Sequence, residues 1–292
     1  MIQNYQNQIN HYLNDHTAEE CAEPTLSTAT MYSLMAGGKR LRPALTLAIC
    51  DAFKVPINQD VLRAACAVEL LHTYSLIHDD LPAMDNDDLR RGRPTNHRRF
   101  GAGMATLAGD GLLTLAFQWV SDNHLPNKIQ LELVRELSRA AGPTGMVAGQ
   151  AMDIHNEGQR LGLSELRLLH RKKTGALLRY AVLAGGIITG QTTQVKSLLA
   201  RFGENYGLAF QIYDDLMDVI GSEGQMGKAV HKDQVEQKNT YPNLLGLEET
   251  KRQLSLVLDQ TRKSKVSLEQ QTHCDFKVLE EFLAYFNIGE ME

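Results

Sequence analysis

The sequence predicts an all-helical protein, and three observations support this. Long apolar runs recur along the 292 residues, and each is apolar around most of a helical circumference. No alternating strand series joined by Asn-Gly or Asp-Gly turns is present. Glycine and proline fall mostly between the apolar runs, as at Gly142-Pro143 and Gly185-Gly186. We therefore expect a single helical domain that spans residues 1–292.

The expected helices follow the apolar runs in chain order. The first well-defined run is 61–71, which is apolar on most sides and therefore indicates a buried helix. Similar runs predict helices over 105–120, 174–188 and 202–220. From about Glu248 onward the chain is more polar, so we expect that part to form an outer layer.

Composition narrows the possible partners and the compartment. The net charge of −5 and the lack of a long basic run argue against nucleic acid as a partner. The N-terminal segment is polar and lacks the features of a signal peptide, and no apolar stretch reaches the roughly 18 residues of a membrane span. The cysteines are scattered, without a CxxC pair, which is typical of free thiols in a reducing cytoplasm: Cys21, Cys50, Cys66 and Cys274.

Two aspartate clusters, each after an apolar helical run, are the most informative feature of the chain. They are Asp79-Asp80-Leu81-Pro82-Ala83-Met84-Asp85 and Asp214-Asp215-Leu216-Met217-Asp218. Carboxylates gathered in this way repel one another unless cations lie between them, and oxygen-rich sites suit Mg²⁺. One such cluster alone is better explained by a solvated acidic turn. Two clusters among apolar residues favour a metal site that holds a phosphorylated substrate.

The second cluster fits a continuous helix, whereas the first does not. Asp214 and Asp218 are four residues apart, so they project from one helix face about 6 Å from each other. Asp79 and Asp85 are six apart and would point in different directions on an unbroken helix. Pro82 disfavours helical geometry before it, so we expect the helix to end here and the chain to curl Asp85 back toward Asp79.

Short basic segments supply candidate phosphate ligands. In Gly37-Gly38-Lys39-Arg40-Leu41-Arg42-Pro43, the side chains of Lys39 and Arg42 are three apart and can share a helix face. Further candidates follow the first cluster or precede apolar runs: Arg90, Arg91, Lys173, Thr174, Lys228 and Lys238. Solvated surface positions are the simpler interpretation of such short runs, and we expect it for Arg171 and Lys172. His72 lies two helical turns before Asp79, where a core histidine is the simpler interpretation.

In type and order, these motifs closely resemble those of the trans-isoprenyl diphosphate synthases, in particular the bacterial short-chain farnesyl diphosphate synthases. The matching segments include both aspartate clusters and span most of the chain. The others are Gly37–Pro43, Arg90-Arg91-Gly92, Lys173-Thr174-Gly175, Phe210-Gln211-Ile212-Tyr213, Gly227-Lys228 and Lys238-Asn239-Thr240-Tyr241-Pro242.

The resemblance implies a fold, a reaction and partners. The fold would be the isoprenoid synthase fold, with helices around a large central cavity, in a homodimer. The reaction would join dimethylallyl or geranyl diphosphate head-to-tail to isopentenyl diphosphate, giving (2E,6E)-farnesyl diphosphate with three Mg²⁺ ions, for which Mn²⁺ can substitute. A geranyl or geranylgeranyl product is the alternative. A terpene cyclase would not need Lys39 and Arg42, and a silent partner subunit should have lost some of these charges.

The resemblance also implies residue roles. Metal ligands would be Asp79, Asp80, Asp85 and Asp214, and the catalytic set adds Lys173 and Gln211 to them. Isopentenyl diphosphate would be bound by Lys39, Arg42, His72 and Arg91. The allylic diphosphate would be bound by Arg90, Lys173, Thr174, Gln211 and Lys228. Product length would be set by Tyr74 and Ser75, since Ser75 lies about 6 Å down the helix from Asp79 and a bulky neighbour can form the cavity floor.

Overall fold

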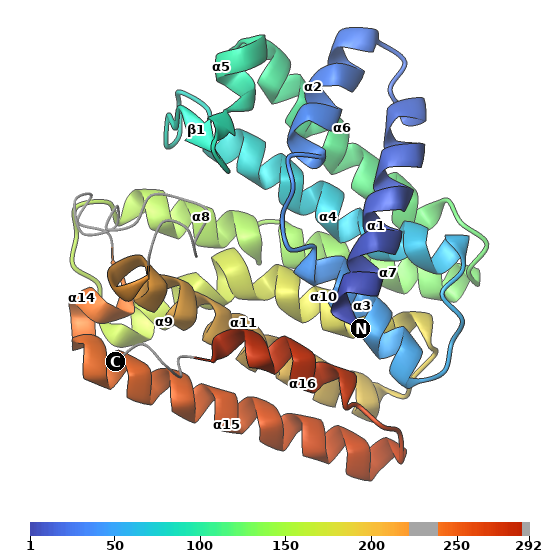
Figure 1. The fold of residues 1–292 in the computed structure, drawn as a ribbon, viewed down its shortest axis with the longest axis vertical. Coiled ribbons are helices and arrows are strands. Elements are labelled where there is room, and N and C mark those ends of the chain that lie inside the picture. Colours follow the sequence, from blue (N-terminus) through green and yellow to red (C-terminus); the bar gives the residue numbers. More distant parts are fainter. Residues whose placement is uncertain (222–238, 288–292) are drawn as a thin grey trace.

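Helices form nearly all of the regular structure in the computed structural model, which describes residues 1–221 and 239–287 (Figure 1). The all-helical prediction is confirmed. Lys228 and Lys238 lie outside the described residues. In the described ranges, no helix is both long and apolar enough to cross a membrane.

The N-terminal part of the chain contains the first aspartate cluster and a small hairpin. Its elements are α1 (Ile2–Thr17), a 3₁₀ turn η1 (Ala18–Glu20), α2 (Pro24–Leu34), α3 (Leu41–Ala52), α4 (Gln59–Asp79), β1 (Leu89–Arg90), β2 (Arg93–Pro94), α5 (Asn96–Phe100) and α6 (Ala102–Ser121). The Asn58 side chain caps α4 by accepting a hydrogen bond from the Val61 N–H at 3.0 Å. The helix ends at Asp79, three residues before Pro82, as predicted.

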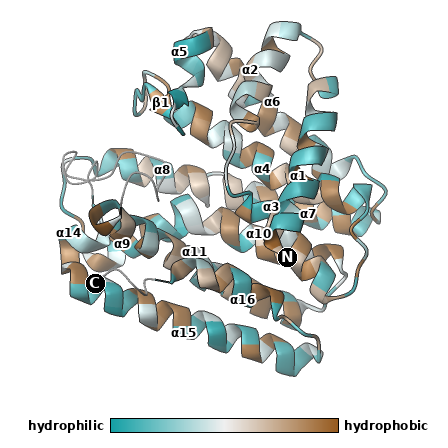
Figure 2. Ribbon diagram, in the orientation of Figure 1, coloured by the Kyte–Doolittle hydropathy of each residue, from teal (hydrophilic) through white to brown (hydrophobic). Residues whose placement is uncertain are grey.

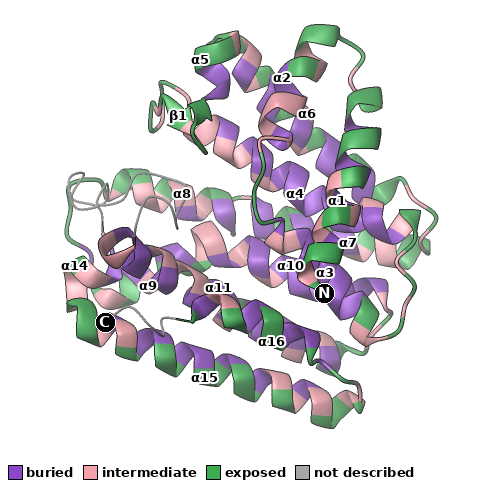
Figure 3. Cartoon of the chain, viewed as in Figure 1, coloured by how far each residue is buried: buried purple, intermediate pink, exposed green. Residues whose placement is uncertain are grey.

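The rest of the chain builds the core and the outer layer. Its elements are α7 (Asn127–Ala141), α8 (Met146–His155), α9 (Leu163–His170), a π-helix η2 (Arg171–Gly175), α10 (Ala176–Ile188), α11 (Thr193–Ile220), α14 (Tyr241–Leu245), α15 (Leu247–Thr272), α16 (Val278–Leu283) and η3 (Ala284–Phe286). Helix α15 packs along α11, and buried and exposed residues alternate along it (Figure 3). Its mixed hydropathy is seen in Figure 2. The predicted outer layer is therefore confirmed.

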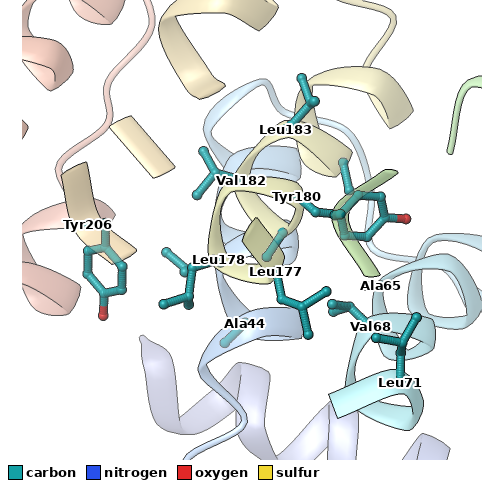
Figure 4. Packing of buried hydrophobic residues seen from close by; sticks show 14 of the residues in the cluster. Ala44, Ala65, Val68, Leu71, Leu177, Leu178, Tyr180, Val182, Leu183 and Tyr206 are labelled. Carbon is teal, nitrogen blue, oxygen red and sulfur yellow. The ribbon is translucent and has the colours of Figure 1, made fainter. Parts of the chain in front are cut away.

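Helix α10 is the centre of the core and packs against α3, α4, α7 and α11. In Figure 4, Leu177 of α10 points toward Val68 and Leu71 of α4. The prediction that Gly185-Gly186 separates two elements is wrong, because both glycines lie inside α10. A Cβ on Gly185 would lie 2.5 Å from the Cβ of Ile49, so this glycine allows α3 to approach closely.

The hairpin after the first aspartate cluster was not expected from the sequence. Leu89 pairs with Pro94 and Arg90 with Arg93 across a two-residue turn. The turn residues Arg91 and Gly92 both have positive φ, 53° and 73°, as a type I′ turn requires. An Arg-Gly turn lacks the Asn-Gly or Asp-Gly signal, which is why strand patterning missed it.

Candidate active site

The chain after α4 curls as predicted, and it brings Asp85 back to the end of the helix. The Asp85 N–H donates a hydrogen bond to the carbonyl of Asp79 at 2.9 Å. The pKa of the Asp79 carboxyl is raised to about 6. Burial is the main cause and Asp85 adds to the rise, whereas the nearby ammonium of Lys173 opposes it. The Asp79 carboxylate is therefore under-neutralised by the protein alone, as expected of a cation ligand.

The second aspartate of this cluster is held by the hairpin. Asp80 is 2% exposed, and both its oxygens accept hydrogen bonds from Arg90, at 2.6 to 2.8 Å. Arg90 is the last residue of β1 and is paired with Arg93 of β2, and from this position its guanidinium contacts the C-terminus of α4. The carboxylate predicted to bind metal and the guanidinium predicted to bind diphosphate are thus paired with each other.

The second aspartate cluster shows the same division between its first two members. Asp214 is partly exposed, whereas Asp215 is 3% exposed and Asp218 is 2% exposed. Asp215 accepts hydrogen bonds from Nε2 of Gln211 at 2.8 Å and from the N–H of Tyr241 at 3.0 Å. Asp215 therefore anchors α14 to α11, whereas the Asp214 side chain is partly exposed.

The π-helix η2 carries the two predicted ligands between the clusters. Nζ of Lys173 donates to Asp153 on α8 at 2.5 Å, and Oγ1 of Thr174 donates to Oε1 of Gln211 at 2.8 Å. Gly149 allows α8 to lie close to η2, since a Cβ there would be 2.1 Å from the backbone nitrogen of Lys173. Single π-helical turns occur frequently at functional sites.

Lys173 thus connects both halves of the candidate site. Its ammonium is near enough to Asp79 to lower the pKa of that carboxyl. Its neighbour Thr174 begins the hydrogen-bond chain that runs through Gln211 to Asp215 in the second cluster. Segments far apart in the sequence therefore meet at η2.

The predicted isopentenyl diphosphate ligands form a cationic group beside the first cluster. Burial lowers the pKa of His72 well below its ordinary value, and Arg42 and Arg91 lower it further. His72 is therefore neutral and lies among cations. Nε of Arg42 is buried and has no hydrogen-bond partner in the described part of the chain. Arg91 donates to the carbonyl of Gly37.

Lys39 and Arg42 do not share a helix face, contrary to the prediction. Lys39 precedes α3, which begins at Leu41, and the intervening Arg40 has a left-handed φ of 49°. Lys39 instead donates to the hydroxyl of Tyr285 at 2.5 Å and lies over its ring at 4.3 Å. The helix-face argument failed because a buried Arg40 breaks the helical course between the two cations.

The residues expected to set product length lie on α4, one helical turn before the aspartates in the chain. Tyr74 is 8% exposed, and its ring meets the ring of His78 edge to face at 5.3 Å between centroids. Ser75 is partly exposed, and its Oγ donates to the carbonyl of His72 at 2.9 Å. Nε2 of His78 lies 3.0 Å from the carbonyl of Thr106, so α6 packs beside this level of α4.

Sequence reasoning missed two residues that shape the site. Asp153, the partner of Lys173, had no signal except its position four residues after Gly149 on one helix face. Arg40 could not be told apart from its two cationic neighbours. It is 2% exposed and forms an ion pair with Glu69 at 2.9 Å.

The site has the right ligand atoms for Mg²⁺, although the protein does not form a cage by itself. In residues 1–221 and 239–287, no group of three or more His, Cys, Asp or Glu side chains is placed to hold a metal ion. Mg²⁺ is usually bound by one or two carboxylates together with phosphate oxygens and water. Asp79 and Asp214 are partly exposed carboxylates, which is the type of donor that this pattern needs.

Comparisons with known proteins agree with this geometry. Residues 23–274 match the family model described as polyprenyl synthetase. A farnesyl diphosphate synthase from Geobacillus stearothermophilus is 51% identical over 82% of this chain and 81% of that protein. A geranylgeranyl diphosphate synthase from Cyanophora paradoxa is 43% identical over 80% of this chain and 78% of that protein.

A solved structure extends the likeness to the fold. The geranyltransferase of Helicobacter pylori, crystallised with magnesium and isoprenyl diphosphate, superposes with a TM-score of 0.85 at 34% identity. The match covers 98% of this chain and 94% of that one. The helical fold, the two aspartate clusters and the matched family model lead to one conclusion: the chain belongs to the polyprenyl synthetase family.

Proposed function

We propose that this protein is a prenyltransferase that condenses dimethylallyl and geranyl diphosphate with isopentenyl diphosphate to give (2E,6E)-farnesyl diphosphate. The observation that carries the proposal is the position of Lys173 between the two clusters. Its ammonium lowers the pKa of Asp79, and its neighbour Thr174 is hydrogen-bonded through Gln211 to Asp215 of the second cluster. A diphosphate held there would contact both clusters at once. The farnesyl diphosphate synthase at 51% identity supports this choice of substrates.

The metal-binding role is assigned to Asp79, Asp85 and Asp214, with Asp80 as a fourth ligand. Both oxygens of Asp80 accept from Arg90, but a carboxylate keeps further lone pairs for a cation. Three Mg²⁺ ions, or Mn²⁺ in their place, would neutralise the diphosphate and so stabilise its departure. The Helicobacter pylori relative with bound magnesium supports the use of this ion.

The allylic diphosphate would be held by hydrogen-bond donors that the chain already orders. Arg90, Lys173, Thr174 and Gln211 are the described members of this set, and Lys228 lies outside the described residues. When the allylic C–O bond breaks, negative charge develops on the departing diphosphate, and these preordered donors stabilise it. Asp153 holds the ammonium of Lys173 in place at 2.5 Å before substrate binds.

Isopentenyl diphosphate would bind the cationic group beside the first aspartate cluster. Lys39, Arg42 and Arg91 supply positive charge, and the neutral His72 supplies a hydrogen bond without adding repulsion among them. The substrate's double bond then attacks the allylic cation, and loss of a proton completes the new alkene. The apolar residues of α4 exclude water from the cation during this step.

Product length is the part of the proposal with a specific competitor. A relative named geranylgeranyl diphosphate synthase is 43% identical, so a twenty-carbon product is the second candidate. The buried ring of Tyr74 at the level of Ser75 favours the shorter, fifteen-carbon chain, because it narrows the space one helical turn above the aspartates.

We also propose that residues 1–292 act as one domain in a homodimer. Leu107 on α6 and Leu131 on α7 are 55% and 70% exposed, and each could be covered by a second copy. Light scattering during size-exclusion chromatography would measure the mass. A monomer at micromolar concentration would contradict the dimer and would leave the proposed chemistry open.

The proposed activity is tested by incubating the purified protein with dimethylallyl and isopentenyl diphosphates and Mg²⁺. Mass spectrometry then identifies the products after phosphatase treatment. Farnesol as the main alcohol supports the proposal, and geranylgeraniol supports the second candidate. A cyclic hydrocarbon, or no product from the protein alone, would refute prenyl transfer by this chain.

A further inference from the structure

A second cationic pocket lies beside η2, apart from the residues assigned to the two substrates. Its volume is about 440 Å³, and it lies among α7, the connection to α8, η2, α10 and α11. The lining residues that carry charge are Glu136, Arg139, Arg171, Lys172, Arg179 and Glu204. Lys173 and Thr174 do not line it. The π-helix therefore lines this pocket with Arg171, Lys172 and Gly175, whereas its Lys173 and Thr174 belong to the candidate active site.

The charges of the pocket are only partly neutralised. Four cations face two carboxylates, which leaves an excess of two positive charges. Arg139 pairs with Glu136 at 2.9 Å, and Arg179 pairs with Glu204 at 2.9 Å.

Among the described residues, neither of the other two cations forms an ion pair with a carboxylate. Nζ of Lys172 donates to the carbonyl of Thr144 at 2.9 Å. Within the part of the chain that the structure describes, the Arg171 side chain has no hydrogen bond or ion pair.

The uncharged lining narrows the class of ligand. It consists of Ala140, Thr144, Gly145, Gly175 and Ala176, so no aromatic ring is available to stack on a nucleobase. Guanidinium groups match the oxygens of phosphates and carboxylates, and three of them near an ammonium favour a ligand with several negative charges. Six charged side chains in the lining make the pocket unsuited to an apolar chain.

We propose that this pocket is a second binding site, which takes a small polyvalent oxyanion such as a short polyphosphate or a tricarboxylate. Arg171 and Lys172 are its main contacts, because neither is neutralised by a carboxylate. Glu204 opposes binding, because it occupies Arg179 and adds negative charge. The site does not depend on the proposed prenyl transfer.

The proposal predicts that substitutions in the pocket will change affinity in opposite directions. Inorganic triphosphate and citrate are titrated into the intact protein by calorimetry, in buffer freed of divalent ions by a chelating resin. The double variant Arg171→Gln/Lys172→Gln should weaken binding about tenfold or more, which is one step of 1.4 kcal/mol. Glu204→Gln should strengthen binding about threefold. Raising the salt from about 0.1 M to about 1 M should abolish it, since the screening length falls to about 3 Å.

Two control variants separate this pocket from other cationic surfaces. Arg262→Gln removes an arginine that is 51% exposed on α15 and does not line the pocket, so it should leave affinity unchanged. Arg42→Gln removes a proposed diphosphate ligand, so it should abolish any binding at the substrate site and leave the binding that Arg171→Gln/Lys172→Gln weakens. Loss of binding in Arg42→Gln but not in the pocket variants would place the anion in the substrate site and overturn the proposal.

The two probes identify the class of ligand. A preference for triphosphate indicates tetrahedral phosphate groups, and a preference for citrate indicates carboxylates; either supports the site. If neither probe binds the unmodified protein up to about 1 mM, the proposal is wrong.

Discussion

Arg40 is the buried cation on which the loop from Gly37 to Pro43 depends, and its removal should destabilise the protein strongly. The guanidinium is 2% exposed and binds Glu69, which is also 2% exposed, at 2.9 Å. It also donates to the carbonyl of Leu34 at 2.6 Å and to Oδ1 of Asn10 at 2.9 Å. Arg40→Met would leave a buried carboxylate without its charge partner and two acceptors without donors.

The expected cost follows from these contacts. Breaking a buried ion pair by removing one partner costs about 3–5 kcal/mol, most of it from the uncompensated charge that remains. Arg40→Met should therefore unfold at a temperature lower by roughly 10 °C, as measured by circular dichroism. The double variant Arg40→Met/Glu69→Leu should recover most of this loss, because the buried carboxylate that Arg40 neutralised is then absent as well.

The same substitution should act on substrate binding through the loop. Lys39 and Arg42 lie on either side of Arg40, so a loosened loop should raise the KM for isopentenyl diphosphate more than that for the allylic substrate. A cost below about 1 kcal/mol for Arg40→Met would refute the structural role of the pair. So would a double variant that is no more stable than the single one.

Four further predictions concern the site and its surroundings. Asp79→Asn should lower turnover at least ~10²-fold at saturating Mg²⁺ while the protein still folds by circular dichroism, and near-normal turnover would remove this carboxylate from the metal site. Arg42→Ala should raise the KM for isopentenyl diphosphate about tenfold or more in steady-state assays, and an equal rise for both substrates would contradict its assignment. Burial lowers the pKa of His170 to about 3, so protons bind the unfolded chain more tightly, and stability present above pH 6.5 is lost as the pH falls. Denaturant titrations should show that His170→Phe removes about 2 kcal/mol of this loss between about pH 6.5 and 5. If the free energy of unfolding of the variant fell with pH as steeply as that of the unmodified protein, the role of His170 would be refuted. Product analysis should find mainly ten-carbon chains with Ser75→Phe and twenty-carbon or longer chains with Tyr74→Ala, and farnesyl product alone from both would put the floor elsewhere.

Local chemistry explains which features could be predicted from the sequence. The end of α4 was predictable because Pro82 acts on its immediate neighbours, and the return of Asp85 to Asp79 follows from it. The long helices were predictable because their apolar residues recur at helical spacing. The grouping of Arg42, His72 and Arg91 agrees with the predicted isopentenyl diphosphate site, whose role remains a proposal.

Features that depend on distant partners were not predictable in this way. Gly185 resembles a helix terminator in sequence, yet it lies inside α10 because Ile49 of α3 needs the space. Arg40 resembles the surface cations beside it, and only Glu69, 29 residues away, identifies it as a buried residue. The π-helix η2 carries no pattern of its own, and its position follows from packing between α8 and α11.

The two aspartate clusters share an arrangement that links fold to function. In each, the first aspartate is partly exposed and the second is buried: Asp79 with Asp80, and Asp214 with Asp215. Successive helical residues point about 100° apart, so an Asp-Asp pair at a cavity wall directs one carboxylate outward and one into the protein. The buried members are fixed by Arg90 and by the Gln211 amide. In each cluster the hydrogen bonds of the buried carboxylate help to fix the local backbone, and we propose that this positions the partly exposed carboxylate for a cation before substrate binds.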